Sequence, residues 1–292
     1  MIRDYRQHFE TYILPKFKDV RLLAIGTGYL TEFRVELLRR GLSVKTCRNI
    51  IDGSLRALYR DARAELDALK GRDPFIDIHW PAVERQKPDP FTAEERDHIL
   101  AFFREREPFY YPWVLTPFVT GTRPSEASAL LVTDVDPERC EISISKSRHL
   151  GADSSPKTPK SCRMIRVPRD AIEALLTLPS WSLATARLFL NKFGDPLDAN
   201  QWARVYWPRV LKGLGIRYRK FYATRHTFIT EMVKRGENLK AIADYCGTSV
   251  MMIEQDYCGT LTLSDRTISA PEWAKPTKGL VVPTGIEPVL PT

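Results

Sequence analysis

PAVERQKPDPFTAEE, residues 81–95, separates two helical regions of this 292-residue chain. Its first ten residues hold three prolines and show no apolar periodicity. Proline lacks a backbone N–H and restricts the residue before it, so this pattern predicts an extended linker over residues 83–90. Thr92 and Glu95 have the spacing of a capping box, which predicts a helix start just after residue 91. We therefore expect two domains, because a single core usually stops growing near about 250 residues.

Before the linker, residues 1–82 are expected to form a helical domain. Between residues 30 and 69 apolar residues recur at helical spacing, and Ser43 is suitably placed as an N-cap. The face predicted to be buried comprises Ile51, Leu55, Leu58, Ala62, Leu66 and Leu69. Basic residues near the start of this helix could follow a DNA backbone or could be ordinary surface; they are Arg39, Arg40, Lys45 and Arg48.

After the linker, residues 91–264 are predicted to form a second, mostly helical domain with a small antiparallel sheet. Apolar and polar residues alternate over residues 140–144 and again over residues 163–167, which is typical of paired strands. The polar stretch between them carries Lys157 and Lys160. Residues 265–292 are expected to be a flexible tail, since residues 271–292 contain five prolines and no periodicity.

The charge of the chain points to a polyanionic partner. The formal net charge is +8, and residues 201–240 alone hold ten Lys or Arg against two Glu. Clustered cations release counterions from phosphates, although a solvated surface would have the same composition. Five cysteines without a C-x-x-C pair indicate neither a disulfide framework nor a zinc site, and we find no membrane span or signal peptide. We expect a cytoplasmic protein associated with the nucleoid.

Four separated segments carry the chemistry. They are TGTRPSEASAL (120–130), KTPKSCR (157–163), YATRHTF (222–228) and GTSVMMIEQDY (247–257). In this order they resemble the signature of the tyrosine recombinase, or phage integrase, family. The resemblance covers residues from about 1 to 262 and implies a DNA-cutting and rejoining enzyme. Its implied fold is a helical, SAM-like core-binding domain followed by a catalytic domain that is mainly α.

The resemblance also implies roles for individual residues. Arg123 and Arg225 match the two catalytic arginines, and Tyr257 matches the nucleophile. Lys157 matches the catalytic lysine better than its neighbour Lys160. The expected supporting residues are Glu126, a buried partner that orients the site, and His226, which follows Arg225 and should point away from it. Two positions depart from the family pattern. Tyr222 stands where histidine is usual, and Thr248 stands where histidine or tryptophan is usual.

These residue types suit attack on a phosphodiester. Two guanidiniums can hold the negative charge that develops on the phosphoryl oxygens. A tyrosine, with an ordinary pKa near about 10, needs cationic surroundings to attack as phenolate. A lysine can protonate the departing 5′ oxygen, and the hydroxyls of Tyr222 and Thr248 can still donate to phosphate. Because a phosphotyrosine conserves the energy of the broken bond, we expect no need for ATP or metal.

The resemblance implies double-stranded DNA as substrate and a homotetramer on paired sites, with accessory DNA-bending or directionality proteins as further partners. Site-specific integration or excision of mobile DNA is the leading interpretation. A type IB topoisomerase would share the chemistry but relax supercoils as a monomer. A catalytically impaired DNA-binding regulator is the other alternative, supported by the two missing histidines. We expect the chain to start directly with its core-binding part, without an arm-binding domain.

Overall fold

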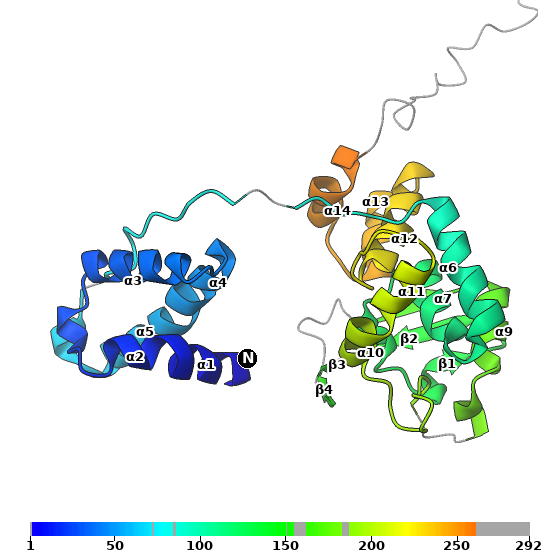
Figure 1. Cartoon of the computed structure of the whole chain (residues 1–292), viewed down its shortest axis with the longest axis horizontal. Coiled ribbons are helices and arrows are strands. Elements are labelled where there is room, and N and C mark those ends of the chain that lie inside the picture. Colours follow the sequence, from blue (N-terminus) through cyan, green and yellow to red (C-terminus); the bar gives the residue numbers. More distant parts are fainter. Residues whose placement is uncertain are drawn as a thin grey trace, which may run out of the picture. The chain divides into compact units, whose positions relative to one another are not determined.

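The computed structural model describes residues 2–71, 73–83, 86–149, 151–154, 162–182 and 187–260 (Figure 1). The chain divides into two compact units, residues 1–86 and 87–292. The division falls within the stretch expected to be a linker. Lys157, Lys160 and the expected tail all lie outside the described residues.

The first unit is all helical. A first helical run has a π-turn in its middle, where Pro15 lacks the N–H that a continuous α-helix needs. Its elements are α1 (Ile2–His8), η1 (Phe9–Ile13), α2 (Leu14–Phe17), η2 (Leu22–Ala24), α3 (Thr27–Arg39), α4 (Val44–Arg48), η3 (Asn49–Leu55), α5 (Arg56–Glu65) and η4 (Asp67–Leu69).

The predicted helix after Ser43 forms, but its buried face differs from the prediction. Ser43 caps α4 by accepting a hydrogen bond from the backbone N–H of Thr46, as expected. The π-turn η3 adds a residue to one turn, which rotates the following residues by roughly 100°. As a result Tyr59 is only 3% exposed, whereas Leu58 and Leu66 are 43% and 49% exposed. The prediction that these two leucines are buried is therefore wrong.

The second unit contains the remaining elements. Its first helix, α6, begins with the predicted capping box between Thr92 and Glu95. The elements are α6 (Ala93–Arg106), η5 (Pro108–Tyr110), α7 (Tyr111–Thr120), α8 (Pro124–Ala127), η6 (Val132–Asp134), β1 (Val135–Asp136), β2 (Glu141–Ile144), β3 (Ser147–His149), β4 (Ala152–Ser154), β5 (Arg163–Arg166), α9 (Arg169–Leu176), η8 (Pro179–Ser182), α10 (Ala199–Val205), α11 (Trp207–Gly213), α12 (Ala223–Lys234), α13 (Leu239–Cys246), α14 (Val250–Asp256) and η9 (Cys258–Thr260).

The predicted strand pair is confirmed as the centre of a three-stranded antiparallel sheet in the order β1-β2-β5. Ile142 of β2 lies opposite Ile165 of β5, and both are 1% exposed. This register places Arg163 at the start of β5, opposite Ile144. A separate hairpin, β3-β4, lies between β2 and β5 in the sequence.

An aromatic core fixes the start of α12. Phe221 packs against Trp113, Trp202 and Trp207, with ring centroids 5.0–5.4 Å apart. All four side chains are buried, so the residues that follow Phe221 start from a rigid point. The linker's last residues are held as well, because Asp89 accepts hydrogen bonds from Arg217.

Candidate active site

Two helices of the second unit end at glycines, and backbone carbonyls at both helix ends accept hydrogen bonds from one buried arginine. Gly121 after α7 and Gly247 after α13 both adopt left-handed backbone conformations, with φ of 61° and 62°. Arg225, only 2% exposed, donates from Nη1 to the carbonyl oxygens of Gly121 (2.6 Å) and Cys246 (2.8 Å). Helix C-termini carry partial negative charge, so they stabilise this guanidinium. Among the described residues no carboxylate forms an ion pair with it.

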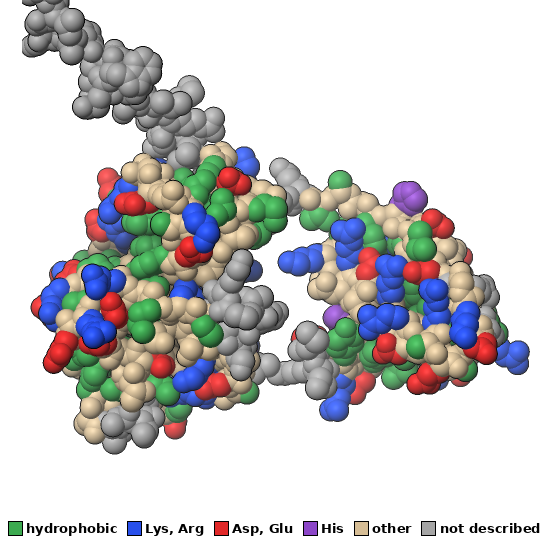
Figure 2. Space-filling view, turned by 180° about the vertical axis from the view of Figure 1, so that it is seen from behind, with side chains coloured by type: hydrophobic (Ala, Val, Ile, Leu, Met, Phe, Trp, Pro, Cys, Tyr) green, Lys and Arg blue, Asp and Glu red, His purple; other side chains and the backbone are tan. Residues whose placement is uncertain are grey.

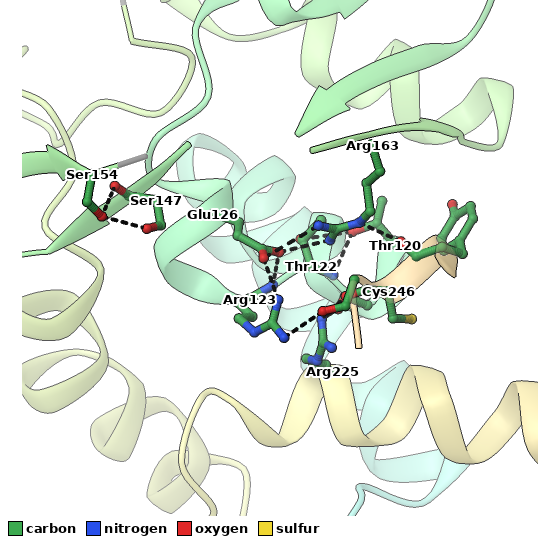
Figure 3. A network of polar contacts seen from close by, with 12 residues as sticks. Thr120, Thr122, Arg123, Glu126, Ser147, Ser154, Arg163, Arg225 and Cys246 are labelled. Carbon is green, nitrogen blue, oxygen red and sulfur yellow. Dashed lines mark hydrogen bonds and ion pairs between the residues drawn. The ribbon is translucent and has the colours of Figure 1, made fainter. Parts of the chain in front are cut away.

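Arg123 is bound to a buried carboxylate (Figure 3). Its Nη1 donates to Glu126 Oε1 at 2.5 Å, and its Nη2 donates to the Gly247 carbonyl at 2.8 Å. Glu126 also receives Arg163 Nη2 at 2.9 Å. Burial would raise the pKa of Glu126, but Arg163 and Arg123 outweigh it and lower that pKa. The carboxylate therefore stays charged and orients Arg123.

Arg163 is a site residue that the sequence argument missed. Its Nε donates to the Tyr245 carbonyl at 2.7 Å, and its side chain is 7% exposed. A Cβ added at Gly247 would lie 2.6 Å from Arg163 Nη1, so the glycine leaves room for this guanidinium. Its position three residues after Lys160, at the start of a predicted strand, was visible, but nothing in the sequence indicated that it turns toward Glu126.

Arg123 opens onto a basic cleft of about 950 Å³. Tyr222 and Thr248, which replace the expected histidines, both line this cleft. Tyr222 is 37% exposed and acts as a hydrogen-bond partner of Arg123. The described residues of the lining include four Lys or Arg, namely Arg123, Lys146, Arg204 and Lys220, and a single acidic residue, Glu126. A polyanion would therefore be attracted to this cleft.

Tyr257 lies directly after α14 and is 6% exposed. Its hydroxyl is 2.6 Å from Nδ1 of His226. Burial raises the pKa of Tyr257, and the charge of Arg225 acts against this shift. His226, which the sequence suggests as a supporting residue pointing away from Arg225, contacts the tyrosine oxygen directly. Tyr257 reaches the imidazole because α13 packs on α12 and α14 packs on α13.

The second unit of the chain matches a known protein family. The sequence profile described as the Phage integrase family matches residues 91–260, which is more than half of the chain. The chain belongs to the phage integrase family. It is a tyrosine recombinase, an enzyme class that cuts and rejoins DNA.

A curated relative agrees with this membership, and two solved structures share the fold. A tyrosine recombinase XerC-like protein of Caldanaerobacter subterraneus subsp. tengcongensis is 27% identical over 281 residues, covering 85% of this chain and 71% of that protein. The fold is similar to that of the Tn1549 transposon integrase in complex with transposon right end DNA, with a TM-score of 0.73, 22% identity, and coverage of 89% and 90%. A lambda integrase tetramer bound to a Holliday junction has a TM-score of 0.61 at 16% identity, covering 85% and 68%.

The recombinase presents a third candidate lysine that the sequence did not indicate. Lys157 and Lys160 lie outside the described residues. Lys146, two residues after β2, lines the same cleft as Arg123, Tyr222 and Thr248. The motif ISISKSRHL carries no signal that distinguishes it from a surface lysine, which is why spacing alone could not find it.

The first unit of the recombinase carries the other predicted contacts. Arg39, Arg40, Lys45 and Arg48 are all exposed, at the end of α3 and in α4. Arg40 donates to Glu36 at 2.6 Å, and the Arg48 guanidinium lies 5.7 Å from the ring centroid of Trp80. Figure 2 shows Lys and Arg side chains interspersed with acidic ones over the visible face of this unit. Because Glu36 pairs with Arg40 and Asp52 with Arg48, the four residues do not form a purely basic patch.

Within the described part of the chain, His, Cys, Asp and Glu side chains form no group of three suited to a metal ion. None of the helices described there has the length and apolar character needed to cross a bilayer.

Proposed function

We propose that the protein recombines DNA at specific sites through a covalent 3′-phosphotyrosine on Tyr257. The Tyr257 oxygen attacks the phosphorus of the scissile phosphodiester and its proton leaves the hydroxyl. The bond from phosphorus to the 5′ oxygen breaks, and that oxygen departs as a hydroxyl after receiving a proton from a lysine. A 5′-hydroxyl of another strand then attacks the phosphotyrosine and reverses the first step, so the reaction needs no external energy source.

The contact of both arginines with consecutive carbonyls carries this proposal. Arg123 binds the Gly247 carbonyl and Arg225 binds that of Cys246, although the two arginines are far apart in sequence. The end of α13 therefore brings two guanidiniums together next to the basic cleft. Preorganised donors of this kind stabilise the extra negative charge of a phosphoryl transition state, typically by several kcal/mol.

Other residues named in the sequence and in the cleft receive supporting roles. The hydroxyls of Tyr222 and Thr248 donate hydrogen bonds to the phosphate where histidines would otherwise do so. Lys157 protonates the leaving oxygen, with Lys160 and Lys146 as rivals for that role. Glu126 keeps Arg123 in place, and its own charge is neutralised from behind by Arg163.

The biological setting is proposed from family membership. Double-stranded DNA is the substrate, and the helical core-binding domain, residues 1–82, contacts it through Arg39, Arg40, Lys45 and Arg48. Four copies assemble on two paired sites, which the lambda integrase tetramer on a Holliday junction supports. Accessory DNA-bending or directionality proteins assist, and the protein acts in the cytoplasm on the nucleoid. The catalytic part comprises residues 91–264.

Capture of the covalent adduct tests this proposal. The full chain is incubated with a library of duplexes nicked at varied positions within random sequence, then denatured in detergent, and the attached DNA is sequenced. We expect a defined sequence to be enriched with wild-type protein and no adduct with Tyr257→Phe. An adduct in Tyr257→Phe would contradict the nucleophile assignment. Specific binding without adduct would favour the DNA-binding regulator, and relaxation of any supercoiled plasmid would favour the topoisomerase.

A further inference from the structure

The proposed function gives no role to the contact between His226 and Tyr257. The imidazole Nδ1 and the phenolic oxygen lie 2.6 Å apart, a short distance for a hydrogen bond between a hydroxyl and a ring nitrogen. The two ring centroids are 5.7 Å apart at an interplanar angle of 45°. His226 therefore touches the atom that the proposed function makes the nucleophile.

Packing holds the tyrosine of this contact. The Tyr257 ring belongs to a core cluster with Ile229 and Val233 of α12, and with Ile242 and Ile253 of the two helices that follow. The Tyr257 backbone N–H also bonds to the Ile253 carbonyl at 2.8 Å. His226 is half-buried and stands on α12. A contact between a tyrosine fixed by a core cluster and a histidine carried by a helix is better preorganised than one between two surface side chains.

Burial, together with the charge of Arg225, keeps the imidazole of His226 neutral in the absence of DNA. Burial and then the charge of Arg225 lower the pKa of His226 to about 4, against smaller opposing effects of Asp256 and Asp89. The other titratable groups facing the ring are Tyr257 and Tyr222, whose ring centroid lies 5.1 Å away. A neutral imidazole has one nitrogen without a proton, so Nδ1 can accept the proton of the phenol.

We propose that His226 is a catalytic residue that accepts the proton of Tyr257 as the tyrosine attacks DNA. This rests on the proposed function, because it assumes that Tyr257 is the nucleophile. The Oη–H bond breaks, the proton moves to Nδ1, and an oxygen lone pair forms the bond to phosphorus. The electrons of the breaking P–O bond leave with the 5′ oxygen, which takes its proton from the cleft lysine. The imidazolium and the neutral lysine then return to their starting states through solvent.

DNA binding makes this transfer easier. A phosphate placed against Arg123 and Arg225 offsets the positive charge of Arg225, which is one of the two causes that depress the pKa of His226. The proton therefore stays on the tyrosine until a phosphate is in place. Tyr222 cannot take over this step, because it lies on the cleft side as a partner of Arg123 and a phenol is a weak base.

The test compares variants of His226 on the duplex recovered from the adduct capture. His226→Ala removes the imidazole, and His226→Asn keeps a hydrogen-bond acceptor at a similar distance from the backbone but is not basic. His98→Ala is the matched control, because His98 is an exposed histidine of α6 in the same unit. Single-turnover adduct formation, DNA binding by mobility shift, and cleavage of a duplex with a 5′-bridging phosphorothiolate are measured for each. A sulfur leaving group does not need an acid catalyst.

We expect both His226 variants to form adduct about 100-fold more slowly, in the range for loss of a general base, with DNA binding within about twofold of wild type. The phosphorothiolate should not restore their rates, whereas His98→Ala should behave as wild type. Wild-type cleavage by His226→Asn would overturn the proton transfer. Recovery of His226→Ala on the phosphorothiolate would also overturn it, since the residue would then serve the leaving oxygen. Absence of adduct with the wild-type protein would instead refute the proposed function.

A measurement without DNA tests the contact itself. The nitrogen-15 shifts of His226 should show an imidazole that is neutral at pH 7 with Nδ1 unprotonated, and Tyr257→Phe should change the Nδ1 shift. An imidazolium, or a proton on Nδ1, would overturn the proposal even if the enzyme recombines DNA.

Discussion

Replacing Gly247 by alanine tests the packing between the end of α13 and Arg163. The added Cβ would lie 2.6 Å from Nη1 and 2.9 Å from Cζ of Arg163, while φ of 62° disfavours any L side chain. The left-handed conformation costs about 1–2 kcal/mol. Displacing a buried guanidinium that is tied to Glu126 and to the Tyr245 carbonyl adds about 1–3 kcal/mol. We therefore expect Gly247→Ala to lower the free energy of unfolding by about 2–5 kcal/mol.

Gly236→Ala provides the matched control. Gly236 follows α12 in the same unit with φ of 77°, and nothing lies within 4 Å of its would-be Cβ. It therefore carries the conformational cost without the clash, and effects on the unfolded chain cancel between the two variants. Denaturant unfolding gives the free energy of unfolding of each variant. The difference between the two variants is the cost of the clash, expected to be about 1–3 kcal/mol. In an Arg163→Ala background this difference should vanish. Equal stabilities of the two variants in the wild-type background would refute the reasoning.

Three further predictions concern the cleft. Arg163 and Arg123 outweigh burial and hold the pKa of Glu126 below its ordinary value of 4.5. The charged Glu126 therefore stabilises the folded protein above about pH 4.5, and this contribution is lost as pH falls through the pKa of the folded state. Glu126→Gln should then cost about 3 kcal/mol at pH 7 and flatten the acid side of the stability curve; parallel curves would contradict this. Tyr222→Phe should slow adduct formation about tenfold with unchanged DNA affinity, and an unchanged rate would exclude a role for its hydroxyl. Of Lys146→Ala and Lys157→Ala, the one recovering on a 5′-bridging phosphorothiolate identifies the general acid, and recovery of neither would place that role elsewhere.

Local patterns in the sequence predicted the elements that local chemistry determines. The capping box at Thr92, the N-cap at Ser43 and the β2-β5 pair depend on neighbouring residues or on period-two alternation, and all three are present. The buried face of α5 was predicted wrongly, because no simple pattern reports a π-turn. Counting residues at 3.6 per turn across such a turn places Leu58 inside when it is outside.

The site was predictable only where family spacing names a residue. Arg123, Arg225 and Tyr257 could be proposed from four motifs, but their partners are set by contacts between distant segments. Arg163 meets Glu126 across 37 positions, and His226 meets Tyr257 across 31. Neither pairing follows from periodicity or charge, since both depend on how α12, α13 and β5 pack.

The end of α13 contacts all three arginines of the site. Gly247 accepts Arg123 and leaves room for Arg163, while the preceding Cys246 carbonyl accepts Arg225. Arg225 has no carboxylate partner among the described residues, so a phosphate that reaches it meets a positive charge that only helix dipoles offset. Arg123, in contrast, shares Glu126 with Arg163, so its guanidinium is well oriented and its charge is partly neutralised. A change at the α13 terminus should therefore disturb Arg123 and Arg225 together, whereas a change at Glu126 should disturb Arg123 and Arg163 but not Arg225.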